Sequence, residues 1–242
     1  MKKNIIKKEI LTEALVLEKS SAKKFISNRS FSVKANSRAN YILVADRSSL
    51  NDVSLSFILE KNSSLNIYYL FLSSTIDNSW NFKHQIKEGA KINSRFLVLG
   101  AKKQNFPIQA DFNFVDQKSF GRINLDSLLM DQSVLNSTFN VNVLPLAQKS
   151  DTRVDMVLRL EGEEAKGSVT PGLNISANDV KAGHSAGTFK LKPEESFYLN
   201  SRGLNKKQIR QLFIMNLSKN FTKDIYDKKI VKEINYLIKS NL

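Results

Sequence analysis

The chain has 242 residues, no cysteine and a formal net charge of +14 at pH 7. Its hydrophobic content of 41% is enough for a sizeable core and excludes global disorder. The absence of cysteine excludes disulfides, thiolate metal sites and cysteine nucleophiles, and it fits a reducing compartment. No stretch reaches the roughly 18 apolar residues that a membrane span requires, so we expect a protein that works in the cytoplasm.

The positive charge is concentrated at both ends of the chain. Residues 1–38 carry 10 Lys and Arg against 3 Asp and Glu, and residues 190–242 carry 12 against 5. Residues 39–189 carry 15 of each sign and are neutral. Solvated, lysine-rich helix faces are the simpler interpretation of the two basic ends. The other interpretation is a basic surface for an acidic partner or a phosphate backbone.

The N-terminal segment, residues 1–38, is predicted to be helical. Apolar residues recur in it near helical spacing at Ile6, Ile10, Ala14 and Leu17. Lysine and glutamate residues between positions 7 and 13 interrupt any apolar run, so an amphipathic helix is favoured over a signal peptide.

The middle segment, residues 39–190, has the period of two that is typical of strands. Apolar and polar side chains alternate in "VSLSFILE", "SLNIYYLF" and "WNFKHQI", and short charged turns such as "EKNSS" and "EGAK" separate these runs. Many short strands with brief turns indicate a sandwich, a barrel or a β-solenoid. The recurrence of a strand followed by a small charged turn favours the β-solenoid.

The C-terminal segment, residues 191–242, is predicted to form a helical module. Pro193 begins a short helix that Gly203 ends. Asn205 and Gln208 then form the capping box of a second helix. The apolar face of the second helix is predicted to consist of Ile209, Leu212, Phe213, Leu217 and Phe221, and a last amphipathic stretch carries Ile230, Ile234, Leu237 and Ile238.

Motifs of common enzymes are missing from the sequence. The chain has no phosphate-binding glycine loop of the G-x-x-x-x-G-K-[ST] or G-x-G-x-x-G type. Its two histidines, His84 and His184, form no standard zinc pattern, and neither accompanies a G-x-S-x-G nucleophile motif. We therefore expect no enzymatic activity from this chain.

Three polar features are candidate sites. His84 alternates in phase with Trp80 and is predicted to be a structural, hydrogen-bonded histidine. The carboxylates Glu161, Glu163 and Glu164 are predicted to be a solvated turn and not a site for a hard cation. His184 has small neighbours that permit close approach of a ligand, and imidazole is a suitable ligand for iron. Structural and functional roles of His184 both stay open at this point.

Residues 147–220 resemble the SufB/SufD family of iron–sulphur cluster assembly scaffold proteins, and SufD more than SufB. The family signature consists of four ordered elements, and the run "AQKSDTRVDMVLRL" resembles the segment that precedes them. The matching residues are Pro171, Leu173 and Ile175; Asp179, Val180 and Lys181; His184 and Ala186; and Phe197, Tyr198, Leu199, Ser201, Arg202, Gly203 and Leu204. The strand-rich body, residues 39–146, agrees with the family only in character.

The resemblance implies a mainly β fold: a right-handed parallel β-helix core flanked by a short N-terminal helical segment and a C-terminal helical module. It implies a non-catalytic scaffold that pairs with a SufB-like subunit through the β-helix edge and binds a SufC-like ABC-type ATPase through the C-terminal helices. ATP hydrolysis would then come from that partner. The candidate residues for these partner interfaces are Asp179, Val180, Lys181, Phe197, Tyr198, Arg202 and Gly203.

The resemblance also assigns His184 as the candidate cluster-assembly residue, an iron ligand shared with the partner chain. No intrinsic cofactor is expected, a transient iron–sulphur cluster at the partner interface is compatible, and a flavin is left open. Two features argue against SufB: Ser185 stands where SufB proteins have a glutamate directly after the equivalent histidine, and cysteine is absent. The family motif H-G-A-T reads "HSAGT" here, so Ser185 and Gly187 alter the local turn. The chain is also short for the family, and we expect it to lack much of the usual N-terminal helical region.

Two alternatives have their own basis in the sequence. The stretch "PEESFYLNSRGLNKKQIRQLFI" superficially fits a helix-turn-helix, so basic terminal helices that bind nucleic acid are the alternative function. A homodimer of the chain alone is the other, because open solenoid edges readily pair.

Overall fold

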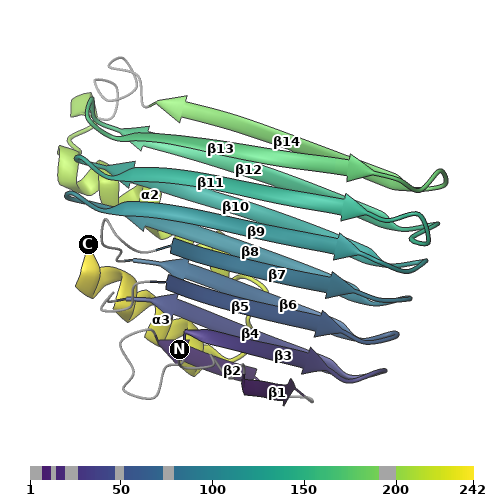
Figure 1. Ribbon diagram of the computed structural model, residues 1–242. Coiled ribbons are helices and arrows are strands. Elements are labelled where there is room, and N and C mark those ends of the chain that lie inside the picture. The colour runs from purple at the N-terminus through teal and green to yellow at the C-terminus, as the bar shows by residue number, and fades with distance from the viewer. Residues whose placement is uncertain (1–6, 12–14, 20–26, 47–51, 73–78, 191–199) are drawn as a thin grey trace, which may run out of the picture.

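The computed structural model describes residues 7–11, 15–19, 27–46, 52–72, 79–190 and 200–242 of the chain. Its strands form two seven-stranded parallel sheets, one made of the odd-numbered and one of the even-numbered strands (Figure 1). The odd-numbered sheet contains β1 (Lys7–Leu11), β3 (Asn28–Val33), β5 (Asp52–Leu59), β7 (Ser79–Ile86), β9 (Asn105–Phe114), β11 (Val134–Val143) and β13 (Lys166–Ile175). The even-numbered sheet contains β2 (Leu15–Lys19), β4 (Arg38–Ala45), β6 (Ser64–Phe71), β8 (Lys91–Gly100), β10 (Phe120–Met130), β12 (Asp151–Glu161) and β14 (Lys181–Lys190).

Successive strands alternate between the two sheets, which makes the fold a parallel β-solenoid and confirms the predicted β-solenoid core. Strands β1 and β2 lie at one end of the solenoid, and β13 and β14 lie at the other (Figure 1). Every described pairing is parallel, so residues at equivalent positions of successive strands stack into rows, and each row is either inward-facing or outward-facing.

The turns from the odd-numbered to the even-numbered sheet also stack. Five of these turns contain one residue with a positive φ, namely Asn36, Asn62, Gly89, Lys118 and Lys149, and asparagine and glycine adopt this conformation most readily. The N–H of Asn36 donates to the carbonyl of Lys61 at 3.0 Å, and that of Asn62 donates to the carbonyl of Glu88 at 2.8 Å. Successive turns are therefore joined by backbone hydrogen bonds, which hold this column of turns in register.

The space between the sheets is filled by apolar and aromatic side chains, and His84 lies among them. Its ring stacks between Phe57 and Phe112, with centroid distances of 5.5 and 4.3 Å. The Tyr69 hydroxyl donates to His84 Nε2 at 2.9 Å, and His84 Nδ1 donates to the carbonyl of Asp111 at 3.3 Å. Burial lowers the pKa of His84 to about 3. The prediction of a structural, hydrogen-bonded histidine is confirmed.

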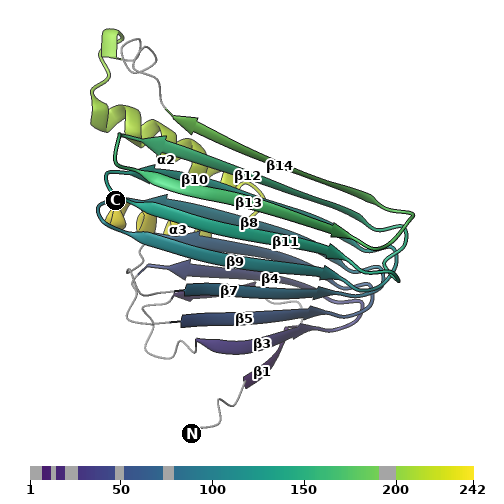
Figure 2. The ribbon, with the colours of Figure 1, turned by 45° about the horizontal axis from the view of Figure 1, so that its top comes forward.

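Two helices, α2 (Lys206–Thr222) and α3 (Lys228–Asn241), cover the outer face of the even-numbered sheet (Figure 2). The predicted capping box of Asn205 and Gln208 is present. A second core forms between the helices and the sheet from Leu217, Phe221, Ile234, Leu237 and Ile238 on the helices and Ile42, Val44, Leu70, Leu97, Leu99 and Met130 on the strands. Neither described helix is long and apolar enough to cross a membrane.

One residue of α2, Leu212, was wrongly predicted to belong to the buried apolar face. Leu212 is 49% exposed, whereas Ile209, Leu217 and Phe221 are buried. The face that meets the sheet follows positions four residues apart, and Leu212 is rotated from this row by about 100°. The C-terminal lysines are exposed on the helices, as the solvated-face interpretation predicts.

The prediction of a helical segment over residues 1–38 was wrong. The described parts of this segment are the strands β1, β2 and β3, which pair in parallel with their neighbours. In β2, Val16 packs against the solenoid interior and Leu17 against the core under the helices. Because both faces of β2 are covered by apolar groups, the period of two is lost and the apolar spacing imitates a helix. Ile6 and Ala14 lie outside the described residues, and the division of the chain into domains stays a prediction.

The interpretation of the basic N-terminal region as a solvated helix face is also wrong for Arg29, which is buried. This guanidinium is 5% exposed and is inward-facing, where it forms an ion pair with Glu18 of β2. The Tyr41 hydroxyl donates to Glu18 Oε2 at 2.6 Å. A charged residue that sequence counting assigned to the surface is thus neutralised inside the fold.

Candidate functional site

His184 lies on β14, the last strand of the even-numbered sheet. Its register partner on β12 is Val154, which faces the solenoid interior and is buried. The same inward-facing row runs through Tyr41, Ile67, Ser94, Ile123 and Val154, all of which are buried. His184 occupies the next position of this row, but no described strand follows β14 in the sheet, so its side chain is exposed.

The last strand of the odd-numbered sheet, β13, lies at the same end of the solenoid as β14, in the facing sheet. Leu173 continues the inward-facing row of Phe112 and Val141, and it is only partly buried. Ile175 is 47% exposed, although its register partner Val143 is buried. We call this surface the open end; it consists of Val169, Leu173 and Ile175 of β13 and Ala182, His184 and Ala186 of β14.

The open end can bind a second chain by two physical means. Its apolar side chains would gain from burial, and full burial of one such side chain contributes about 1.5–3 kcal/mol. The edge strands β13 and β14 are each 10 residues long, and edge strands present unpaired backbone N–H and C=O groups that pair with another strand.

The predicted interface residues Asp179, Val180 and Lys181 lie at the same end as His184. Val180 packs against the solenoid core, while Asp179 and Lys181 are exposed. The segment is tied to the turn beneath it, since the N–H of Lys149 donates to the carbonyl of Asp179 at 2.5 Å and the N–H of Asp179 donates to Gln148 Oε1 at 2.9 Å.

The other predicted interface residues precede α2. Arg202 and Gly203 are exposed, and Gly203 has a φ of +85°, the left-handed conformation expected at the end of a helix. Phe197 and Tyr198 lie outside the described residues. No described contact brings Arg202 or Gly203 to His184.

Helix α2 is anchored to the solenoid by an ion pair that the sequence did not predict. Arg210 Nε donates to Glu161 Oε2 at 2.9 Å, and the same guanidinium lies 3.3 Å from Asp131 Oδ1. Although partial burial acts to lower it, the pKa of Arg210 is raised because Glu161 and Asp131 stabilise the cation. Glu161 is thus a docking residue for α2, whereas Glu163 and Glu164 are exposed turn residues, as predicted. No local pattern links residues that are 49 positions apart.

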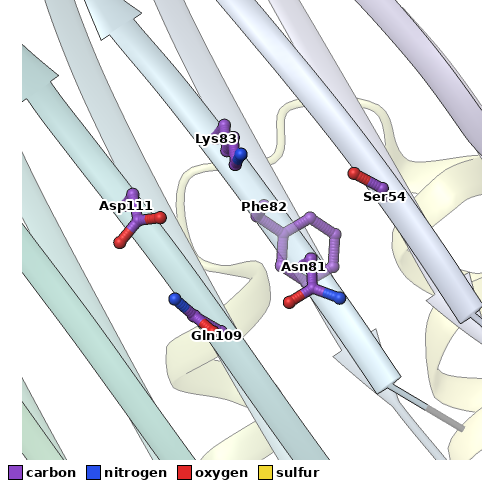
Figure 3. A pocket seen from close by; sticks show the side chains of 6 residues that line it. All are labelled: Ser54, Asn81, Phe82, Lys83, Gln109 and Asp111. Carbon is purple, nitrogen blue, oxygen red and sulfur yellow. The ribbon is translucent and has the colours of Figure 1, made fainter.

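The outer face of the odd-numbered sheet carries a shallow polar depression of about 280 Å³ (Figure 3). Its rim is formed by Ser54, Asn81, Lys83, Gln109 and Asp111, with the ring of Phe82 beneath. The depression lies on the other sheet and shares no residue with the open end. Among the described residues, no group of three His, Cys, Asp or Glu could hold a metal ion.

Comparison with known proteins agrees with the family resemblance seen in the sequence. A family model described as "SUF system FeS cluster assembly, SufBD core domain" matches residues 2–217. An iron–sulfur cluster assembly SufBD family protein of Pyrococcus horikoshii is 25% identical over 161 residues, which cover 64% of this chain and 36% of that protein.

Two proteins named iron–sulfur cluster assembly protein SufD are also similar. The Escherichia coli protein is 31% identical over 94 residues, 39% of this chain and 22% of its own length. The Bacillus subtilis protein is 34% identical over 68 residues, 28% of this chain and 16% of its own length. The matched part therefore spans well under half of each relative.

Proposed function

Because this chain belongs to the SufBD family of iron–sulphur cluster assembly proteins, we propose that it is a SufD-like, non-catalytic scaffold subunit of a cytoplasmic SufBCD-type complex. It pairs with a SufB-like chain through the open end and binds a SufC-like ATPase through its C-terminal helices. ATP hydrolysis is supplied by that ATPase.

The single observation that carries the pairing is the position of His184. Its backbone register is that of a buried residue, and the side chain is exposed only because the row ends there. The same holds for Leu173 and Ile175 on β13. A surface built from interior positions is complementary to the end of a second solenoid, which would continue both sheets and cover both rows.

Docking of the ATPase is proposed on the solvent face of α2. Leu212 and Met215 are 49% and 63% exposed and lie three positions apart, so they are neighbours on the helix surface. The opposite face of α2 is packed on the even-numbered sheet, which keeps the helix in place. An exposed apolar pair on an anchored helix, in surroundings that contain lysines, suits an apolar groove with an acidic rim.

The chemical role proposed for His184 is that of one iron ligand to a cluster under assembly. The nascent cluster is cargo of the complex and not a resident cofactor. Since the chain has no cysteine, thiolate ligands would come from the SufB-like partner. We propose no intrinsic cofactor and assign no flavin.

Co-expression with the two partner chains tests the pairing. We expect a tagged chain to capture both. Leu173→Asp should lose the SufB-like chain and keep the ATPase, because it places a charge in the open end. Met215→Asp should do the reverse, and Lys83→Ala, on the far sheet, should retain both. Capture of neither partner by the unaltered chain would refute the proposal.

The ligand role needs a separate experiment. His184→Ala should leave the complex intact and lower its iron and sulphide content after cluster assembly. An unchanged content in that variant would remove His184 from the ligand set while leaving the scaffold role in place.

The nucleic-acid hypothesis has a weaker basis. The face of α2 that carries Ile209, Leu217 and Phe221 is occupied by the sheet, and Arg210 is engaged by Glu161. We expect no salt-dependent retardation of DNA at micromolar protein concentration, since phosphate binding would require several free cations in one groove.

A further inference from the structure

Strand β14 depends on few contacts for its position. None of its ten residues is buried, and β12 is its one neighbour in the sheet. Its attachment therefore rests on the backbone ladder to β12 and on side-chain contacts, with little help from burial. Among the described residues, one side-chain hydrogen bond joins the two strands: Ser185 Oγ donates to Asp155 Oδ1 at 2.5 Å.

The acceptor of this bond is itself held in place. Arg153 Nε donates to Oδ1 and Oδ2 of Asp155 at 2.9 and 2.8 Å. Partial burial acts to raise the pKa of Asp155, but the hydrogen bonds from Arg153 and Ser185 lower it overall. Asp155 is therefore ionised at neutral pH, and a hydroxyl donor to a carboxylate makes a stronger bond than a neutral pair does.

The direction of His184 follows from the direction of Ser185. Successive residues of a strand point to opposite faces, and Ser185 is the register partner of the outward-facing Asp155. As long as Ser185 is bound to Asp155, His184 is directed to the inner side of the sheet, at the open end.

We propose that Ser185, Asp155 and Arg153 form a clip that positions His184 for contact with the partner chain. Ser185 is in this sense a positioning residue: it touches neither the cluster nor the partner, and it acts through the orientation of β14. The proposal rests on the proposed function, because it specifies how the open end is kept ready for pairing.

Threonine and valine have nearly the same shape, so placing each at position 185 separates the effect of the hydroxyl from that of side-chain size. Ser185→Thr keeps the donor, and Ser185→Val lacks it; both residues are β-branched and suit a strand. In the valine variant we expect the amides of β14 to exchange about tenfold faster with deuterium, and in the threonine variant to exchange as in the unaltered chain. Ser168→Val is the matched control, because Ser168 Oγ of β13 donates to Asn136 Oδ1 of β11 at 3.2 Å and has no part in the clip.

Two measurements report on the positioning of His184: its NMR signal and the affinity of the chain for the SufB-like partner. The Cε1–H NMR signal of His184, assigned by its loss in His184→Gln, should shift in the valine variant and not in the threonine variant or in Ser168→Val. The affinity for the SufB-like chain should fall about fivefold in the valine variant alone.

Each other result overturns the clip. Equal amide exchange in the two variants at position 185 would show that the bond does not hold β14. Faster exchange with an unchanged His184 signal and unchanged capture would show that the bond is structural only. Failure of the proposed function is distinguishable from both, since the unaltered chain would then capture no SufB-like partner while the exchange difference would persist.

Discussion

His84 and His184 face the same interior, yet their surroundings are opposite. His84 belongs to the row that runs from Phe31 to Leu173, and strands lie on both sides of it. It is fully buried between two aromatic rings, whereas His184 ends its row and is exposed. In a solenoid the burial of an inward-facing side chain is therefore decided by whether another strand stacks on it, and not by its own strand.

The comparison predicts its largest effect in stability. His84→Ala removes the stacked ring contacts with Phe57 and Phe112 and leaves the Tyr69 hydroxyl buried without its acceptor, so the free energy of unfolding should fall by about 3 kcal/mol. His184→Ala should change it by about 0.5 kcal/mol or less, as is usual for exposed sites. Urea unfolding of the three proteins measures both values, and similar losses in the two variants would contradict the comparison.

A pH dependence should come from His84 as well. The folded state holds its pKa at about 3, below the ordinary value of 6.5, so between these values the unfolded chain binds a proton that the folded chain does not. Stability is then fully present above pH 6.5 and declines as the pH falls, by about 2 kcal/mol at pH 5.

Variants at the two histidines test this dependence by urea unfolding at pH 7 and pH 5. His84→Gln should lose this part of the pH dependence, and His184→Gln should retain it. A dependence that survives unchanged in His84→Gln would show that other groups cause it.

The smallest predicted change in stability concerns Tyr69, whose hydroxyl donates a hydrogen bond to His84. Tyr69→Phe removes the hydroxyl that donates to Nε2 at 2.9 Å, and the aromatic ring keeps its place in the stack. The free energy of unfolding should fall by about 1 kcal/mol, because the histidine acceptor stays buried. No change at all would mean that the hydrogen bond contributes little beyond the packing of the rings.

Sequence patterns predicted the parts of the molecule that local chemistry controls. Alternation in "VSLSFILE" and "SLNIYYLF" specified strands with one inward face, and the small turns between them specified short connections. Asn205 and Gln208 marked the start of α2 because a capping box satisfies backbone donors within one turn. Strand β2 was missed because it is covered on both faces, which removes the alternation.

The candidate site was predicted only as a set of residues. The family-like motifs named His184 and the segment from Asp179 to Lys181, but neither their common place at the open end nor the contact of Ser185 with Asp155 has a local signature. Asp155 and Ser185 are 30 positions apart, and Arg210 and Glu161 are 49 apart. Such pairs meet because strands and helices are stacked.

Alternation of apolar and polar residues is therefore sufficient to specify that this chain forms strands and which side chains point inward, because a strand has a period of two. The stacked structure alone decides which inward-facing side chains are buried and which form a surface, because burial requires a neighbouring strand. That difference makes one histidine part of the core and the other the centre of the candidate site.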